Sequence, residues 1–385
     1  MKRLRSMRLL PVGAIVAVIL VGCGGEDTTE DDNAEDTGAT ATDETEEAED
    51  TEPDTDSNDE TEPEGDAQDP TQGDPVQLTF GHFVPATHLV HENVAQHLAD
   101  ELEDVTDGRI TVDIHPGGAL GPPDGQFENV QAGSFDIGFG LHFYTPGRFP
   151  LQTVMEFPFL FDSAEQATSA YFQLYEEFPE LRAEMEGVKV LGLWTHDLGE
   201  LMSRDDPIHE PSDLEGMRIR SPGPLQNTLI EALGGSPVTT PAPEIYDSVD
   251  RGVVDGVIGA YSLVTSFNLD ETINHASKGG FYVATFFLVM NQETWDALTP
   301  EDQALLDSLT GEDISLRAAR AYDEGYDLAD ARLREAGIEP YEFSSEELEV
   351  WRDAAEVVVE DWIAEQEAEG RPAREIYDRL LEIVE

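Results

Sequence analysis

Two periods of hydrophobic and polar residues predict most of the secondary structure. The stretches VQLTFGHF (76–83) and RITVDIH (109–115) alternate apolar and polar side chains, which is the period of a β-strand. Between them, apolar residues recur every three or four positions up to Gly108, which predicts a helix that ends at this glycine. The almost continuous apolar runs VKVLGLW (188–194) and YVATFFLVMN (282–291) predict strands buried on both faces. This succession of strands and helices predicts an α/β fold.

The C-terminal part of the chain carries a helical pattern almost throughout. Thr299-Pro300 predicts a helix start, because a Thr cap followed by Pro suits the free N–H groups of the first turn. A long second helix is predicted from Glu312 to Ala336, and a third contains the segment from Trp351 to Trp362. Further upstream, Ser212–Glu215 has the spacing of a capping box.

Two segments of the chain repeat each other at an offset of 119 residues. The stretches VQAGSFDIGFG (130–140) and VDRGVVDGVIG (249–259) share Val, Gly, Asp and Gly at identical spacing, and the same offset aligns Pro122 with Pro241. Each copy predicts an amphipathic helix that ends at glycine and is followed by a strand. The repeat indicates two lobes of like construction, with a cleft between them in which a small ligand can bind.

Residues 1–75 predict an export signal followed by a tether. Four basic residues precede an apolar run from Leu9 to Gly22, which is the layout of a signal peptide and is short for a membrane span. The stretch LVGC (20–23) resembles the bacterial lipobox, so we expect residues 1–22 to be removed and Cys23, the only cysteine, to be lipidated. Residues 24–75 contain 23 Asp or Glu and no Lys, Arg or aromatic residue. This composition predicts that residues 23–75 form a disordered acidic tether.

Acidic residues outnumber basic ones by 83 to 21, and the body (76–385) retains 60 acidic and 17 basic residues. Nucleic acid is excluded as a partner, since binding it requires a basic surface. Such acidity keeps a protein soluble where salt screens its self-repulsion, so it predicts a halophilic habitat. With one cysteine, the chain forms no internal disulfide and must be held by core packing.

The sequence carries no recognisable catalytic motif. It lacks Gly-x-Ser-x-Gly, Gly-x-x-x-x-Gly-Lys and His-Glu-x-x-His, so we expect neither an enzyme nor a cofactor. His88 and His91 lie three residues apart on the first predicted helix, but a solvated helix face explains them without a metal. The strand MRIRSPGP (217–224) places Arg218 and Arg220 on one face before a proline turn. These guanidinium groups are expected to bind either carboxylates of the fold or an anionic ligand.

The chain from about residue 78 to 335 resembles the solute-binding proteins of tripartite ATP-independent periplasmic (TRAP) transporters, of the dicarboxylate type. The resemblance rests on the order and spacing of several segments: LTFGHF, GRITVDIHPGGALG, VQAGSFDIGFG, MEFPFLFDSAEQA, PSDLEGMRIRSPGP, ALGGSPVTTPAPEIYDSVDRGVVDGVIG and FLVMNQETWDALTPEDQALL.

This resemblance implies a two-lobed, periplasmic-binding-protein-like (Venus-flytrap) α/β fold, with hinge strands and a long helix that spans both lobes. The first lobe is expected to comprise residues 76–196 and about 286–335, and the second residues 197–285 and 336–385. A monomer held at the outer face of the cell membrane by its lipid would close around an organic acid. It would then deliver the acid to the small and large membrane subunits of an ion-gradient-driven permease. A similar receptor for another transporter or a sensor, and an extracellular hydrolase, are the alternatives.

In the family, an Arg on the strand that resembles MRIR usually binds the ligand carboxylate bidentately, and this Arg maps to Arg220. Arg218 is expected to be structural, and Glu156 to lie near the cleft and pair with Arg220 in the empty form. Gly199 and Gly259 stand where the family often has Arg and Asn, so a small dicarboxylate or sugar acid is not implied. Aromatic and His side chains in the cleft segments favour a larger or less polar monocarboxylate, although each is also typical of a core: His82, Phe83, His142, Tyr144, Trp194, His196, Tyr261 and Phe286.

Overall fold

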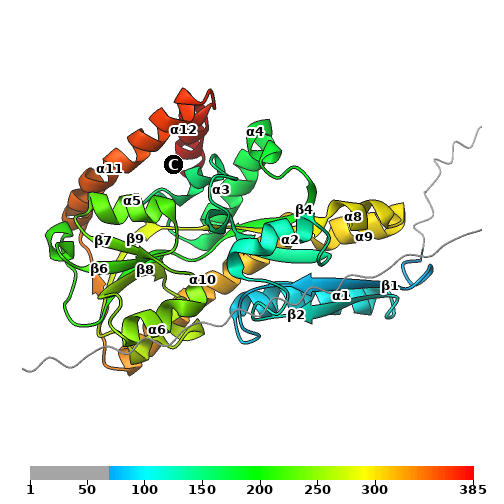
Figure 1. Cartoon of the computed structure of the whole chain (residues 1–385), viewed down its shortest axis with the longest axis horizontal. Helices are drawn as coiled ribbons and strands as arrows, with labels where there is room; N and C mark the ends of the chain where they lie inside the picture. Colours follow the sequence, from blue (N-terminus) through cyan, green and yellow to red (C-terminus); the bar gives the residue numbers. More distant parts are fainter. Residues whose placement is uncertain (1–68) are drawn as a thin grey trace, which may run out of the picture. The chain divides into compact units, whose positions relative to one another are not determined.

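Two β-sheets organise residues 69–385, the part of the chain that this computed structural model describes (Figure 1). The first sheet has the strand order β2-β1-β3-β10-β4, and the second has the order β11-β9-β5-β8-β6-β7. The predicted signal peptide, Cys23 and most of the predicted tether lie outside the described residues. The strands are β1 (Val76–Gly81), β2 (Ile110–His115), β3 (Ile137–Leu141), β4 (Val188–Thr195), β5 (Gly199–Ser203), β6 (Arg218–Ser221), β7 (Ser236–Thr239), β8 (Gly256–Ala260), β9 (His275–Tyr282), β10 (Thr285–Asn291) and β11 (Tyr341–Glu342).

Both sheets follow the same plan. Three parallel strands lie side by side, β2-β1-β3 in one sheet and β7-β6-β8 in the other. Each sheet then takes an antiparallel strand from across the molecule: β10 lies between β3 and β4, and β5 lies between β8 and β9. The chain therefore crosses between the sheets at residues 196–198 and 283–284. The two crossings are bonded together, since the His196 N–H donates to the Ala284 carbonyl at 3.1 Å. The expected two-lobed α/β fold with hinge strands is confirmed.

The repeated segments have the same structure in the two lobes. A 3-10 turn, a short helix and a buried strand follow one another as η2 (Pro123–Gly125), α2 (Gln126–Gln131) and β3, and again as η6 (Ala242–Glu244), α6 (Ile245–Asp250) and β8. Asp136 donates its N–H to the Thr79 carbonyl (3.0 Å) and accepts from the Thr79 N–H (2.8 Å). Asp255 binds Arg218 in the same way, at 2.7 and 2.9 Å. The aspartate that the two segments share thus binds β3 to β1 in the first lobe and β8 to β6 in the second.

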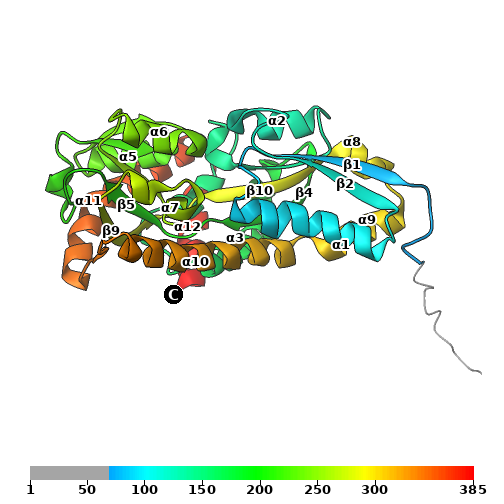
Figure 2. The same ribbon diagram turned by 90° about the horizontal axis from the view of Figure 1, so that it is seen from below.

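The long predicted helix is α10 (Glu312–Glu335), and it runs along both lobes (Figure 2). It packs against α3 (Ala164–Glu177) and β4 in the first lobe and against α7 (Leu263–Ser266) in the second. A Cβ atom at Gly325 would lie 3.0 Å from both Leu89 Cδ2 and Ser262 Cβ. Glycine is unfavourable inside a helix, so its presence here is explained by the close approach of α10 to both lobes.

The C-terminal helices divide between the lobes. Helix α11 (Ser345–Ala368) packs against α5 (Pro224–Ala232) of the second lobe, whereas α12 (Ala373–Val384) packs against α3 of the first. Ile376 and Leu380 of α12 share a core cluster with Tyr171 of α3. This differs from the expectation that residues 336–385 all belong to the second lobe, because α12 buries its apolar face on the first.

Several boundaries differ from the predicted ones. The helix predicted up to Gly108 consists of a π-helical turn, η1 (His91–Gln96), and α1 (His97–Val105). The strand predicted from residue 282 begins at Thr285, because Tyr282 still belongs to β9. The remaining elements are η3 (His142–Tyr144), η4 (Gln152–Glu156), α4 (Pro179–Ala183), η5 (Pro211–Leu214), η7 (Leu269–Glu271), α8 (Gln292–Ala297) and α9 (Pro300–Leu309).

Two further local differences have clear causes. The capping box uses Glu210 and Asp213, not the predicted Ser212–Glu215, because Pro211 takes the first helical position. Part of the predicted tether is bound to the body: Arg109, paired with Asp302, donates to the Pro70 carbonyl at 3.0 Å. Within residues 69–385, no helix is both long enough and apolar enough to cross a membrane.

Candidate functional site

A cavity of about 40 Å³ lies between the lobes, beside the two chain crossings. Its walls come from the first lobe, the second lobe, the hinge and α10, so its shape depends on how the lobes are placed. The lining residues are Phe83, Val84, His88, Leu141, Phe143, Tyr144, His196, Arg220, Pro222, Ala242, Ala260, Leu263, Tyr282, Phe286 and Tyr322.

Arg220 supplies the only Lys or Arg side chain in this cavity wall, and it is 1% exposed. Its Nε donates to the Thr240 carbonyl at 2.9 Å, and Nη1 approaches the Ile258 carbonyl at 3.4 Å. Within residues 69–385 no carboxylate lies within 4.0 Å of the guanidinium group. Burial lowers the pKa of Arg220, while the nearby phenol groups of Tyr144 and Tyr282 act in the opposite direction. A buried cation without a counter-ion is costly, and an anion that enters the cavity would compensate for it.

Arg218 shows the contrasting case on the same strand. Its guanidinium is about half exposed and binds Asp255 with two hydrogen bonds, of 3.0 and 2.6 Å. The Asp255 carboxylate therefore neutralises the charge of Arg218. The expectation that Arg218 is structural agrees with this ion pair.

The remaining cavity wall is mostly aromatic. Phe286 stacks on Trp194, with 5.3 Å between ring centroids and 7° between ring planes, and lies 5.8 Å from the ring of Tyr322. Phe83 meets Tyr144 edge to face at 5.6 Å. Flat apolar walls of this kind suit a ligand whose body is apolar or aromatic.

Two glycines set the shape of the wall. A Cβ atom at Gly199 would overlap the Tyr282 ring, and one at Gly259 would lie 2.9 Å from Leu263 Cδ1 and 3.6 Å from Arg220 Nη1. Tyr282 and Leu263 both line the cavity. The Tyr282 ring and the Leu263 side chain thus occupy the space beside Gly199 and Gly259, the two positions where the family often has Arg and Asn.

Four of the seven predicted site residues line this cavity: Arg220, Tyr144, His196 and Phe286. Tyr144 also joins the lobes, because its hydroxyl accepts a hydrogen bond from the Ala242 N–H at 3.0 Å.

The structure places the other three predicted residues elsewhere. His82 turns away to bind His91 (2.9 Å) and stacks on Phe139. Tyr261 packs on Tyr326 at 4.7 Å, and its hydroxyl lies 3.4 Å from Asp330 of α10. Glu156 lies outside the Arg220 cavity, and no ion pair with Arg220 is present in this conformation.

Residues 80–366 match the family described as bacterial extracellular solute-binding protein, family 7. The chain belongs to this family. Its members are solute-binding receptors and not enzymes, and solved TRAP receptors share its two-lobed fold. The C4-dicarboxylate-binding periplasmic protein DctP of Rhodobacter capsulatus is 24% identical over 76% of this chain and 88% of its own length.

Two solved TRAP receptors are similar in both sequence and fold. A receptor of Bordetella bronchiseptica with bound (R)- and (S)-mandelate is 30% identical, with a TM-score of 0.75 over 80% of this chain and 99% of its own. A receptor of Rhodoferax ferrireducens with copurified benzoate is 26% identical, with a TM-score of 0.77 over 80% and 97% of the two chains.

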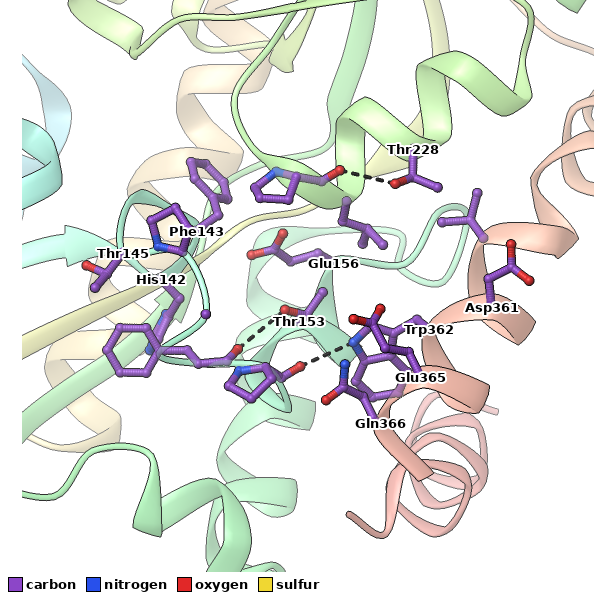
Figure 3. A pocket seen from close by; sticks show the side chains of 17 residues that line it. His142, Phe143, Thr145, Thr153, Glu156, Thr228, Asp361, Trp362, Glu365 and Gln366 are labelled. Carbon is purple, nitrogen blue, oxygen red and sulfur yellow. Dashed lines mark hydrogen bonds between the residues drawn. The ribbon is translucent and has the colours of Figure 1, made fainter. Parts of the chain in front are cut away.

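Glu156 lines a second, larger cavity of this TRAP receptor, of about 300 Å³, between η3, α5 and α11. Figure 3 shows its side chain in the cavity wall, with Trp362 and Gln366 of α11 on another wall. One carboxylate oxygen accepts from Gln226 Nε2 of α5 (3.0 Å), and the other accepts from the Thr285 hydroxyl at the start of β10 (3.3 Å). Burial raises the pKa of Glu156 to about 7. Glu156 therefore links the walls of the interlobe region behind the Arg220 cavity.

Sequence reasoning missed three polar residues of the Arg220 cavity: His88, Tyr282 and Tyr322. His88 was attributed to a solvated helix face, yet it is 3% exposed. Tyr282 lies at the end of β9, next to the second chain crossing, and this position at the hinge is the signal that could have identified it. Within residues 69–385 no group of three or more His, Cys, Asp or Glu is arranged to hold a metal ion.

Proposed function

We propose that this TRAP receptor captures a monocarboxylic acid with an aromatic or similarly apolar body in the Arg220 cavity, which has to open beyond its present volume of about 40 Å³ to admit such a ligand. The observation that carries the proposal is the buried guanidinium of Arg220 without a carboxylate partner. A ligand carboxylate would supply the counter-ion and the acceptors that Arg220 lacks.

The preference for an apolar body is supported by the apolar part of the cavity wall. Tyr282 and Leu263 lie over Gly199 and Gly259, and Phe286 extends the surface. A polyhydroxylated acid would leave its hydroxyl groups against these rings without partners, which costs binding free energy. The similar receptors with bound benzoate and mandelate carry ligands of the proposed kind.

Delivery to the small and large membrane subunits of a TRAP permease, and anchoring through Cys23, complete the proposal. The anchor is supported by the basic start, the apolar run and the lipobox-like LVGC. A Cys23→Ser protein should be released from the membrane or remain as an unprocessed precursor. Membrane-bound Cys23→Ser protein of mature size would exclude the anchor.

The test is calorimetric titration of benzoate and other aromatic monocarboxylates at high salt, with melting temperature as a second readout. The protein should bind at least one of them, and Arg220→Ala should weaken binding by about 2–5 kcal/mol, as expected for truncating one partner of a buried charge pair. Arg218→Ala is the matched control, since Arg218 lies two residues away on β6 but binds Asp255. A folded Arg220→Ala protein that binds within threefold of wild type would overturn the proposal.

A further inference from the structure

His196 in the cavity wall is held in one tautomer by the hinge. Its Nδ1 contacts the carbonyl oxygen of Asp197, and since a carbonyl can only accept, Nδ1 must carry the proton. Burial lowers the pKa of His196 to about 4, so the ring is neutral near pH 7 and Nε2 keeps a free lone pair. Within the described part of the chain, no donor reaches this nitrogen.

The surroundings prevent His196 from turning to another partner. Its backbone N–H is bound to Ala284 of the second crossing (3.1 Å). The Asp197 carboxylate accepts from the Ser262 N–H (2.8 Å) and the Ser262 hydroxyl (2.6 Å). The ring itself meets Tyr282 edge to face at 5.0 Å. An acceptor is therefore fixed in the wall of the cavity.

His88 carries its ring proton on the other nitrogen. The Val90 N–H donates to His88 Nδ1 at 3.2 Å, so this nitrogen is the acceptor of the ring. Burial lowers the pKa of His88 to about 4, and the neutral ring then carries its proton on Nε2. The cavity wall thus includes one imidazole that can donate through Nε2, that of His88, and one that can accept through Nε2, that of His196.

We propose that His196 is a specificity-determining residue whose Nε2 accepts a hydrogen bond from a hydroxyl group next to the ligand carboxylate. The receptor then selects a 2-hydroxy acid over the same acid without the hydroxyl. The hydroxyl lies next to the carboxylate because His196 and Arg220 share the wall of one small cavity. This inference rests on the proposed function, since Arg220 must first hold the carboxylate. An unsubstituted acid would bury the His196 lone pair without a partner, and sites built around a hydroxyl discriminate strongly for this reason.

The experiment compares mandelate with phenylacetate, which differ only in the 2-hydroxyl group. Both are titrated into the wild-type protein and into His196→Phe at high salt. Wild type should bind one enantiomer of mandelate at least tenfold more tightly than phenylacetate. His196→Phe should reduce this ratio to within twofold, because mandelate loses its acceptor and phenylacetate no longer leaves the imidazole nitrogen without a partner. His88→Phe is the matched control and should change both affinities by a similar factor, because its donor cannot replace the His196 acceptor.

The outcomes separate the two proposals. Equal wild-type binding of the two acids, or a preserved ratio in His196→Phe, overturns the role of His196 and leaves the monocarboxylate proposal standing. Failure of mandelate, phenylacetate and benzoate to bind overturns the proposed function. If His196→Phe does not fold, ¹⁵N resonances of histidine in the wild-type protein decide. Mandelate should shift the unprotonated Nε2 of His196 and phenylacetate should not, and a shift by both or by neither overturns the inference.

Discussion

Arg218 and Arg220 show how two identical side chains on one strand acquire different roles. The Arg218 side chain is 47% exposed and paired with Asp255, and such exposed pairs contribute little to stability. Arg220 is buried, and its guanidinium group is bound to backbone carbonyls and lies beside the Tyr144 phenol. In a protein with 83 acidic residues, a buried arginine without a carboxylate partner cannot be explained by a shortage of partners. Its surroundings exclude them, which supports the proposal that the guanidinium group binds a ligand carboxylate.

The planar shape of Arg220 matters as much as its charge. Arg220→Lys should weaken binding of an aromatic monocarboxylate at least tenfold, mainly through faster dissociation, because an ammonium group cannot donate two parallel hydrogen bonds. Stopped-flow or surface-based kinetics measure this, with Arg218→Lys as the control that should change the dissociation rate less than twofold. Equal dissociation rates for wild type and Arg220→Lys would contradict bidentate binding.

The candidate site could be predicted only partly from the sequence. Arg220 was found through the family resemblance, because its motif is local. Tyr261 and Tyr282 each adjoin an apolar segment near the hinge, and the three-dimensional position of α10 separates their roles: Asp330 of α10 lies beside Tyr261. His88 was missed because its spacing to His91 suggested a shared helix face, whereas His91 binds His82.

Among the elements, the chain crossings and the strands beside them control the cavity. Gly199 begins β5 immediately after the first crossing, and the ring of Tyr282, at the second crossing, packs on it. The Tyr282 side chain, which lines the Arg220 cavity, thus already fills the space between the two crossings. Substitutions there change the hinge and the ligand site together.

Gly199→Ala should therefore destabilise the protein by about 1–3 kcal/mol, because the added methyl group overlaps the Tyr282 ring. Thermal unfolding should show a melting temperature several degrees lower, and aromatic acid binding should weaken. Gly125→Ala is the control: its φ is −113° and its nearest neighbour, Asn129, would lie at 3.4 Å. Combining Gly199→Ala with Tyr282→Ala should recover part of the lost stability, and strict additivity of the two changes would contradict the clash.

The elements themselves were largely predictable where one periodic pattern dominates. The long helix and the strands β1, β2 and β4 follow their hydrophobic patterns closely. At residues 282–291 the hydrophobic pattern predicted the wrong strand start. The apolar run continues through the crossing at residues 283–284, so it does not show where β9 of one sheet ends and β10 of the other begins. Similarly, no pattern in the sequence indicates the π-helical turn of η1, which depends on tertiary packing.

At the scale of the whole body, its excess of acidic residues opposes the approach of an anionic ligand. The groove outside the cavity, of about 510 Å³, shares Phe143 and Tyr144 with the cavity and carries Asp124 and Glu244 on its two sides. An anion that enters along this groove passes these carboxylates before it reaches Arg220. Screening shortens the reach of their repulsion from about 10 Å at 0.1 M salt to about 3 Å at 1 M.

Raising salt from 0.1 to 1 M should therefore speed the association of an aromatic carboxylate severalfold and change its dissociation much less. Stopped-flow fluorescence measures both rates. The double variant Asp124→Asn, Glu244→Gln should associate faster at low salt and depend less on salt. An association rate that falls as salt rises would contradict this electrostatic picture.

Buried titratable groups set the pH dependence of stability. Within residues 69–385 burial raises the pKa of five carboxyl groups: to about 7 for Glu156, Glu184 and Glu200, to about 8 for Asp197, and in the same direction for Asp323. Burial lowers the pKa of six imidazoles in this part of the chain: to about 3 for His82, to about 4 for His88, His142 and His196, and in the same direction for His91 and His97. The carboxyl groups destabilise the fold as pH rises, and the imidazoles destabilise it as pH falls below about 6.5. The two effects oppose each other between about pH 4.5 and 6.5.

Between about pH 7.5 and 8.5 the carboxyl groups act almost alone, because histidine is then largely neutral in both states. The folded protein retains protons that the unfolded chain has lost, so the free energy of unfolding should decrease as pH rises through this window. Melting temperatures at constant high salt should fall from about pH 7.5 to 8.5. Glu156→Gln should reduce this fall, and Glu349→Gln, at an exposed position of α11, should leave it unchanged. A melting temperature that rises over this interval would refute the prediction.

The exchange of strands between the sheets also bears on how the protein is made and secreted. When residues 76–195 have left the ribosome, the first sheet still lacks β10, the strand that lies between β3 and β4. That strand follows β5 to β9 of the second sheet in the chain, so the first sheet is completed only once residue 291 has been synthesised. A chain that completes its first sheet late should stay extended for longer, which suits threading through a narrow export channel. The architecture that forms the hinge of the mature receptor should thereby delay folding until most of the polypeptide is available.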